Sequence, residues 1–171
     1  MEDFHISQLK SLMNSNKFTM AVAESLTMGN IQAAIGSISG ASTFFEGGMT
    51  VYNLEQKARF LGVDREHAEK INSVSSRVAT EMAKGVCLKF ECDIGIGTTG
   101  YAEPHDSEGI ASPHAYFAIW RRHLGTNKGE LVESQLVTGE GLSRVEMQIH
   151  VTHTVISALI KYLQTMPGTK H

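Results

Sequence analysis

Apolar residues along this chain follow two spacings, which separate helices from strands. Runs with an apolar residue every three or four positions predict amphipathic helices, and shorter, continuously apolar runs predict strands. Helices are expected over residues 4–15, 27–38, 54–61, 64–70, 75–88 and 142–163. Strands are expected over residues 18–23, 44–52, 93–99, 114–121 and 131–137. Helices alternate with strands until two strands come in succession, which predicts an α/β fold with three α/β/α layers and a mixed central sheet.

Residues that stop or cap helices support this division of the chain. Gly62 follows the third predicted helix and is expected to end it. Asp64 and Ser75 precede the next two helices and are expected to cap them through their side-chain oxygens. Gly47 and Gly48 fall inside a predicted strand, which indicates a bulge or a close approach of another backbone.

Ser25 lies where the first predicted strand ends and a helix is about to begin. The first backbone N–H groups of a helix have no partner inside the helix, and the helix dipole favours negative charge at that end. A serine there can cap the helix, hold an anion, or act as a nucleophile beside an oxyanion site. Capping is the commonest of the three roles, and position alone does not decide among them.

Three polar groups of residues follow predicted strands and are candidates for one site. In open α/β sheets, ligands bind beyond the carboxyl ends of the strands. A serine needs a base to attack a carbonyl, and a lysine or tyrosine with a lowered pKa can provide one. Each residue also has an ordinary structural explanation, as a cap, a strand-end tyrosine, a solvated lysine or a partner for backbone groups. The three groups are Ser25 with Thr27, Tyr52 with Lys57, and Thr98, Thr99 and Gly100.

Length and composition fit one compact domain over residues 1–171, with a core over about residues 5–163 and a short tail over 164–171. The formal net charge of −3 gives no basic surface for nucleic acid, and no apolar run is long enough for a membrane span. The N-terminus has no signal-peptide core, and Cys87 and Cys92 are expected to be reduced thiols. These features favour a cytoplasmic protein.

Several ordered motifs resemble the C-terminal domain of CinA, a family that includes stand-alone nicotinamide mononucleotide deamidases. The resemblance runs from about residue 5 to residue 163. Residues 23–29 resemble the family's Ala-Glu-Ser-x-Thr-Gly-Gly, residues 47–57 its Gly-Gly-x-x-x-Tyr-x-x-x-x-Lys, Val74 and Ser75 its Val-Ser, and residues 99–104 its Thr-Gly-x-Ala-Gly-Pro.

The resemblance implies a fold, a reaction and a set of residues. The implied fold is the three-layer CinA-like domain, and the implied reaction is hydrolysis of the nicotinamide carboxamide to a carboxylate and ammonia. The family's nucleophile matches Ser25, and its assisting residues match Tyr52 and Lys57. No metal or cofactor is implied, the substrate is a small nucleotide-like molecule, and a homodimer is expected. The expected substrate-binding residues are Glu24, Thr27, Gly29, Gly48, Thr99, Gly100 and Arg144.

Three departures from the family pattern bear on the substrate. Met28 and Glu103 stand where the family has glycines, and Ala115 stands where another glycine is usual. Side chains at positions 28 and 103 are expected to narrow or reshape the pocket, and Glu103 brings negative charge to the place expected for a nucleotide phosphate. The alternative function is therefore a paralogue that binds a nucleotide-like ligand or a partner protein without turnover.

The catalytic hypothesis makes geometric predictions. Ser25 Oγ should lie about 3 Å from Tyr52 Oη or Lys57 Nζ, and Lys57 should be shielded from water because a solvated lysine is a poor base at neutral pH. Thr99 and Gly100 should border the same pocket. Backbone N–H groups of residues 27–29 are expected to stabilise the oxyanion.

Histidine groups elsewhere in the chain are weaker candidates. His150 and His153 lie one turn apart on the last predicted helix without an identifiable third ligand, so surface histidines are expected. His105, Asp106 and His114 could hold a cation, with a solvated loop as the default. The glycines of residues 95–100 are not a dinucleotide fingerprint, because no helix follows them.

Overall fold

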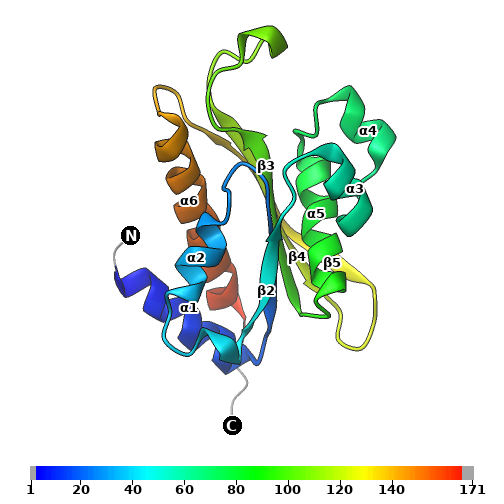
Figure 1. The fold of residues 1–171 in the computed structure, drawn as a ribbon. Helices are drawn as coiled ribbons and strands as arrows, with labels where there is room; N and C mark the ends of the chain where they lie inside the picture. Colours follow the sequence, from blue (N-terminus) through cyan, green and yellow to red (C-terminus); the bar gives the residue numbers. More distant parts are fainter. Residues whose placement is uncertain (1–2, 167–171) are drawn as a thin grey trace.

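The computed structural model describes residues 3–166, which form one sheet between two layers of helices (Figure 1). The α-helices are α1 (Asp3–Asn16), α2 (Asn30–Gly36), α3 (Leu54–Leu61), α4 (Arg65–Lys70), α5 (Ser76–Lys89) and α6 (Arg144–Thr165). The strands are β1 (Met20–Glu24), β2 (Phe45–Thr50), β3 (Ile94–Tyr101), β4 (His114–Arg122) and β5 (Gly129–Thr138). Two short 3-10 helices, Ala41–Thr43 and Asp106–Glu108, complete the set. None of the helices within these residues combines the length and apolar character needed to cross a bilayer.

The sheet is mixed, with the strand order β2-β1-β3-β4-β5. Strand β1 runs parallel to both β2 and β3, whereas β4 pairs antiparallel with β3 and β5 antiparallel with β4. Helices α1, α2 and α6 cover one face of the sheet, and α3, α4 and α5 lie on the other (Figure 1). The predicted three-layer fold with a mixed sheet is confirmed.

Two main hydrophobic clusters, one on each face, hold the layers together, and a small third cluster of alanines joins α5 to β4. The larger contains Leu9, Ile31 and Val155, from the helices of one layer, packed against the sheet. The smaller contains Val78 and Met82 of α5. Burying a side chain of this size contributes about 1.5–3 kcal/mol, so both helical layers are fixed by their apolar faces.

The cap predictions are confirmed, and so is the irregularity at the paired glycines. The side chain of Asp64 accepts a hydrogen bond from His67 N, and that of Ser75 from Val78 N. The β1–β2 register shifts between Met20 and Ala21, which pair with Phe45 and Gly47. Glu46 is therefore the extra residue of a bulge.

The second predicted helix begins later than its sequence pattern indicates, at Asn30 rather than residue 27. Met28 and Gly29 both have positive φ angles, of 51° and 93°. A right-handed helix requires negative φ, so the helix cannot begin before these two residues. Residues 25–29 instead form a compact turn after β1.

Four chain segments meet at one edge of the sheet because of the strand directions. The parallel strands β1, β2 and β3 all end there, and β5, antiparallel to β4, ends there as well. Ser25 and Tyr52 follow β1 and β2, Gly100 lies at the end of β3 with Glu103 just after it, and Arg144 follows β5. The fold therefore brings together residues that are up to 119 positions apart.

Candidate active site

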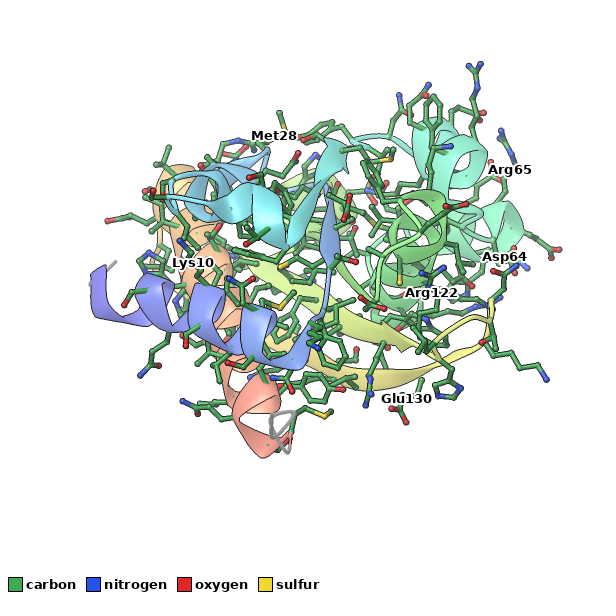
Figure 2. All side chains as sticks on the ribbon, turned by 90° about the horizontal axis from the view of Figure 1, so that it is seen from below. Lys10, Met28, Asp64, Arg65, Arg122 and Glu130 are labelled. Carbon is green, nitrogen blue, oxygen red and sulfur yellow. The ribbon has the colours of Figure 1, made fainter. Side chains whose placement is uncertain are left out.

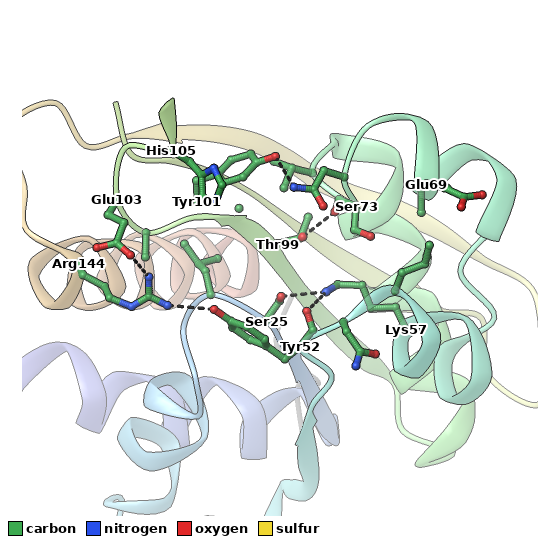
Figure 3. A pocket seen from close by; sticks show the side chains of 18 residues that line it. Ser25, Tyr52, Lys57, Glu69, Ser73, Thr99, Tyr101, Glu103, His105 and Arg144 are labelled. Atoms are coloured by element: carbon green, nitrogen blue, oxygen red, sulfur yellow. Dashed lines mark hydrogen bonds and ion pairs between the residues drawn. The ribbon is translucent and has the colours of Figure 1, made fainter. Parts of the chain in front are cut away.

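A cavity of about 440 Å³ opens at this edge of the sheet (Figure 3). It is bordered by segments that follow β1, β2, β3 and β5, and by the connection between α4 and α5. Thr99 and Gly100 border the same cavity as Ser25, as predicted. Six of the residues expected in the site line it: Ser25, Tyr52, Lys57, Thr99, Gly100 and Arg144.

Ser25 and Lys57 form a direct contact at the base of this cavity. Lys57 Nζ donates a hydrogen bond of 3.0 Å to Ser25 Oγ and another of 2.8 Å to the backbone oxygen of Tyr52. Lys57 is only 2% exposed, and Ser25 is 5% exposed. Both predictions for this pair, contact between the two side chains and shielding of the lysine, are confirmed.

Lys57 lies in the first turn of α3 and is one of the two buried residues of that helix. Asn53 caps this helix by accepting a hydrogen bond from Gln56 N, which fixes the turn that carries Lys57. Burial lowers the pKa of Lys57 from 10.5 to about 8. No carboxylate among the described residues lies within ion-pair distance of its Nζ, so nothing offsets the loss of hydration.

The phenol of Tyr52 is directed away from the serine. Tyr52 is 56% exposed, and its Oη accepts a hydrogen bond of 3.0 Å from Arg144 Nη2. The backbone oxygen of Tyr52, rather than its side chain, contacts Lys57. The structure therefore pairs Ser25 with Lys57 and places the Tyr52 side chain at the rim of the cavity (Figure 3).

Arg144 forms an ion pair at the same rim. Its Nη1 lies 2.6 Å from Glu103 Oε1, so its two terminal nitrogens are both engaged. Glu103 follows β3 and lines the cavity, as its place in the sequence motif suggested. Both side chains are about half exposed, at 42% for Arg144 and 54% for Glu103.

Glu24 does not line the cavity but is fully buried under the start of α2. Its carboxylate accepts hydrogen bonds from the backbone N–H groups of Gly29, Ile31 and Gln32, at 2.9, 3.2 and 2.9 Å. These are the donors that a helix start leaves without partners. Glu24 is therefore a cap that acts from the end of the preceding strand, and the structure gives it no contact with the cavity.

The expected oxyanion donors are also engaged within the protein. Met28 N donates to Ser25 O at 3.2 Å, and Gly29 N donates to Glu24. The prediction that residues 27–29 supply these donors is therefore wrong for Met28 and Gly29. The backbone N–H of Leu26, the residue after the serine, has no acceptor among the residues that the structure describes.

Three other expected binding residues lie outside the cavity, where they support the fold. Thr27 is buried, and its Oγ1 shares a hydrogen bond of 2.9 Å with Thr98 Oγ1. Gly29 begins α2. Gly48 lies against β1, where a Cβ would be 2.7 Å from the backbone oxygen of Val22. That distance is shorter than a contact between these atoms allows, so glycine is required at position 48 by packing.

Two of the three departures from the family pattern leave the cavity unchanged. Met28 is 52% exposed, and Figure 2 shows its side chain at the periphery of the molecule. Ala115 is buried in β4 opposite Gly100 and does not line the cavity. The expectation that a side chain at position 28 narrows the pocket is therefore wrong. Glu103 is the departure that reaches the site.

The connection between α4 and α5 supplies cavity residues that the motifs did not indicate. Asn72 Nδ2 donates to Tyr101 Oη at 2.9 Å, and Thr99 Oγ1 donates to the backbone oxygen of Ser73 at 2.7 Å. Asn72 and Ser73 both have positive φ angles. The polar pair before the Ser75 cap marks a loop in the sequence, but no linear pattern places that loop beside β3.

The histidine loop after β3 shows local contacts. His105 Nδ1 lies 3.1 Å from Ser107 Oγ, and His114 Nδ1 lies 3.2 Å from the backbone oxygen of Ser112. Within residues 3–166, no three His, Cys, Asp or Glu side chains are placed to hold one metal ion. Cys87 and Cys92 are free and buried.

Comparison with known sequences gives a family match and relatives that are longer than this chain. A model of the CinA C-terminal domain matches residues 3–163. A CinA-like protein of Flavobacterium psychrophilum is 38% identical over 125 residues, which cover 73% of this chain and 29% of that protein. A putative competence-damage inducible protein of Limosilactobacillus fermentum is 38% identical over 139 residues, 81% of this chain and 32% of that protein. The chain thus spans about three tenths of these relatives.

Solved structures with the same fold also exist. A competence or damage-inducible protein from Enterobacter asburiae superposes with a TM-score of 0.80 at 27% identity, covering 93% of this chain and 96% of that one. A CinA superfamily protein from Enterobacter cloacae gives a TM-score of 0.82 at 24% identity, covering 93% and 90%. At that identity, the second likeness establishes a common fold only.

Proposed function

The chain belongs to the CinA C-terminal domain family, and from this premise we propose that it is a serine amidohydrolase of the nicotinamide mononucleotide deamidase type. One observation carries the proposal: the hydrogen bond of 3.0 Å between Ser25 Oγ and the buried Lys57 Nζ. A buried lysine without a carboxylate partner is costly to keep charged, and this cost is what makes it a base near neutral pH.

In the first half of the reaction, neutral Lys57 accepts the Ser25 proton as Oγ attacks the carboxamide carbon. With a pKa of about 8, roughly a tenth of the lysine is neutral at pH 7, compared with well under a thousandth for a solvated lysine. The resulting ammonium donates a proton to the departing nitrogen, and ammonia leaves. Ser25 then carries the acyl group as an ester.

The second half reverses these roles with water. Lys57, neutral again, accepts a proton from a water molecule that attacks the ester carbon. The ammonium of Lys57 returns the proton to Ser25 Oγ as the C–O bond breaks, and the product carboxylate leaves. The overall change is one amide and one water converted to one carboxylic acid and one ammonia, which leave at neutral pH as a carboxylate and an ammonium ion.

The negative oxygen formed in each half needs donors, and Leu26 N–H is the donor we assign. Leu26 directly follows the nucleophile and lines the cavity. Its backbone N–H has no acceptor among the described residues. The N–H of the residue after the nucleophile plays this part in other serine hydrolases. A well-placed donor of this kind contributes about 3–4 kcal/mol to transition-state stabilisation.

Ammonia release from three carboxamides tests the proposal: nicotinamide, nicotinamide riboside and nicotinamide mononucleotide. We expect hydrolysis of at least one, and a loss of at least about 10³-fold in Ser25→Ala because the nucleophile is removed. Ser37→Ala, which changes an exposed serine at the end of α2, is the matched control and should retain full activity. Ammonia release no faster than that of Ser25→Ala with all three compounds would refute the proposal.

The engaged state of Arg144 supports a second candidate, a paralogue that binds a nucleotide-like ligand without turnover. Both terminal nitrogens of Arg144 already have partners, and one of these partners is the Glu103 carboxylate, whose charge disfavours a phosphate at this rim. A ligand that raises the melting temperature but is recovered unchanged after long incubation would favour this candidate. Conversion of that ligand to its acid would favour the hydrolase.

A further inference from the structure

The charges that line the cavity nearly cancel. The charged side chains among the lining residues are Lys57, Glu69, Glu103 and Arg144. Lys57 must be neutral to accept the serine proton, so in the reactive state one cation faces two carboxylates. In this state, which about a tenth of the molecules occupy at pH 7, the cavity carries a net negative charge that attracts a cation and repels an anion.

Arg144 is the more exposed cation of this set and so the side chain best placed to bind a phosphate, and each of its terminal nitrogens already has a partner. A guanidinium recognises a phosphate by presenting two parallel N–H donors to two oxygens. Here Nη1 is 2.6 Å from Glu103 Oε1 and Nη2 is 3.0 Å from Tyr52 Oη. A phosphate that reached Arg144 would share the guanidinium with Glu103 and lie beside its negative charge.

The repulsion is strong because both groups are charged at neutral pH. A phosphate monoester carries about −1.5 to −2 charges at pH 7. At separations of about 4–5 Å near a partly exposed carboxylate, such a repulsion weakens binding by about tenfold or more. Arg144 offsets part of this effect, but it is shared between the two anions.

Two tyrosines and an amide offer a different kind of contact. Tyr52 and Tyr101 both line the cavity (Figure 3), and an aromatic ring attracts a cation placed over its face. Asn72 and Ser73 border the same space and supply groups that can hydrogen-bond hydroxyls. A positively charged ring with a hydroxylated, uncharged substituent matches these walls.

We infer that this cavity selects a cationic N-glycosyl pyridine carboxamide that lacks a phosphate, and that Glu103 is the residue that excludes the phosphorylated form. The inference rests on the proposed function for the identity of the reacting group. It rests on the Glu103–Arg144 pair for the selection. Nicotinamide riboside has the favoured chemistry, and nicotinamide mononucleotide differs from it by the phosphate alone.

Calorimetric titration of Ser25→Ala with both compounds tests the selection independently of turnover. We expect the riboside to bind at least about tenfold more tightly than the mononucleotide. Adding Glu103→Gln, which keeps the size of the side chain and removes its charge, should tighten mononucleotide binding by about tenfold or more and change riboside binding less than about threefold. Glu108→Gln, on the same loop but outside this cavity, is the matched control and should change neither.

A third variant identifies Arg144 as the group that Glu103 occupies. Arg144→Gln added to Glu103→Gln should remove the gain in mononucleotide binding, because the freed guanidinium is what holds the phosphate. Raising the salt concentration should reduce the ratio of riboside to mononucleotide affinity when Glu103 is present, because salt screens the repulsion between the phosphate and this partly exposed carboxylate.

The outcomes separate this inference from the proposed function. Tighter or equal binding of the mononucleotide, binding of neither compound, or an unchanged ratio in Glu103→Gln would overturn the inference. Selective binding of the riboside, with no ammonia release by the unmodified protein, would uphold the selection and overturn the hydrolase. Ammonia release with a preference for the mononucleotide would uphold the hydrolase and overturn the selection.

Discussion

Replacing Lys57 by methionine should make the protein more stable and inactive at the same pH. Burial lowers the pKa of Lys57 from 10.5 to about 8, which means that the folded state holds the lysine proton less tightly than the unfolded chain. Below about pH 8 both states are protonated, and folding carries the full penalty of about 3 kcal/mol. As the pH rises from 8 towards 10.5, the folded protein loses its proton first, so the free energy of unfolding increases.

Methionine has a similar length and no charge, so it removes this penalty. The substitution also leaves the backbone oxygen of Tyr52 without its hydrogen bond from Nζ, which costs about 1–2 kcal/mol. The expected balance is a gain of about 1–2 kcal/mol in the free energy of unfolding at pH 7, and no gain or a loss near pH 10. Hydrolysis should fall by about 10²- to 10⁴-fold because the base is missing.

Urea denaturation followed by circular dichroism, at several values between about pH 6 and pH 10, measures the stability difference. The pH profile of kcat/KM for the unmodified protein should rise about tenfold per unit below the pKa of Lys57 and level off above it. Lys161→Met, which removes an exposed lysine on α6, is the matched control and should change stability by less than about 0.5 kcal/mol.

Two results would refute this account of Lys57. A loss of stability at pH 7 in Lys57→Met would mean that the ammonium is stabilised in the folded protein. A kcat/KM that does not vary between about pH 6 and pH 9 would mean that no group with this pKa acts as the base.

Two further predictions concern the turn after β1. Glu24→Ala should lower the free energy of unfolding by about 3–5 kcal/mol, because three N–H groups at the start of α2, shielded wholly or in part from water, lose a charged acceptor. The control is Glu46→Ala, which changes an exposed residue, and a loss below about 1 kcal/mol in urea denaturation of Glu24→Ala would contradict the capping role. Met28→Gly should raise the melting temperature and increase the free energy of unfolding by about 0.5–1 kcal/mol, because glycine adopts positive φ without strain. It should leave kcat/KM within about twofold because the Met28 side chain is exposed, and a larger fall would mean that this side chain contacts the substrate.

The fold could be predicted from the sequence because its signals are local. Helix α3 was expected at residues 54–61 and is found there, since Gly62 takes a φ of 68° directly after it. Asp64 and Ser75 directly precede their helices and accept hydrogen bonds from N–H groups three residues further on, so both caps can be recognised from the local sequence. The start of α2 was misplaced because the side chain that caps it belongs to Glu24, five residues before the N-cap position at Gly29. Gly29 itself provides no side-chain cap that a sequence pattern could detect.

The site was predicted in part, and the missing part depends on contacts between distant segments. Residue patterns left the role of Ser25 open, and the family resemblance selected Lys57 as its partner. The direction of the Tyr52 phenol could not be foreseen, because it is set by Arg144, 92 residues further along the chain. The burial of Lys57, which determines its pKa, likewise arises from packing rather than from its neighbours in sequence.

Glu24 and Ser25 are adjacent, yet the structure gives them opposite surroundings, and this difference constrains how the serine can be activated. The Glu24 carboxylate satisfies the start of α2, so the partial positive charge of that helix is already compensated and cannot stabilise a serine alkoxide. Under the proposed mechanism, the field of this helix therefore contributes little to activation, and the Ser25 proton has to be removed by a base. Lys57 is the group in contact with Ser25 Oγ that can act as this base, so the rate should follow its titration.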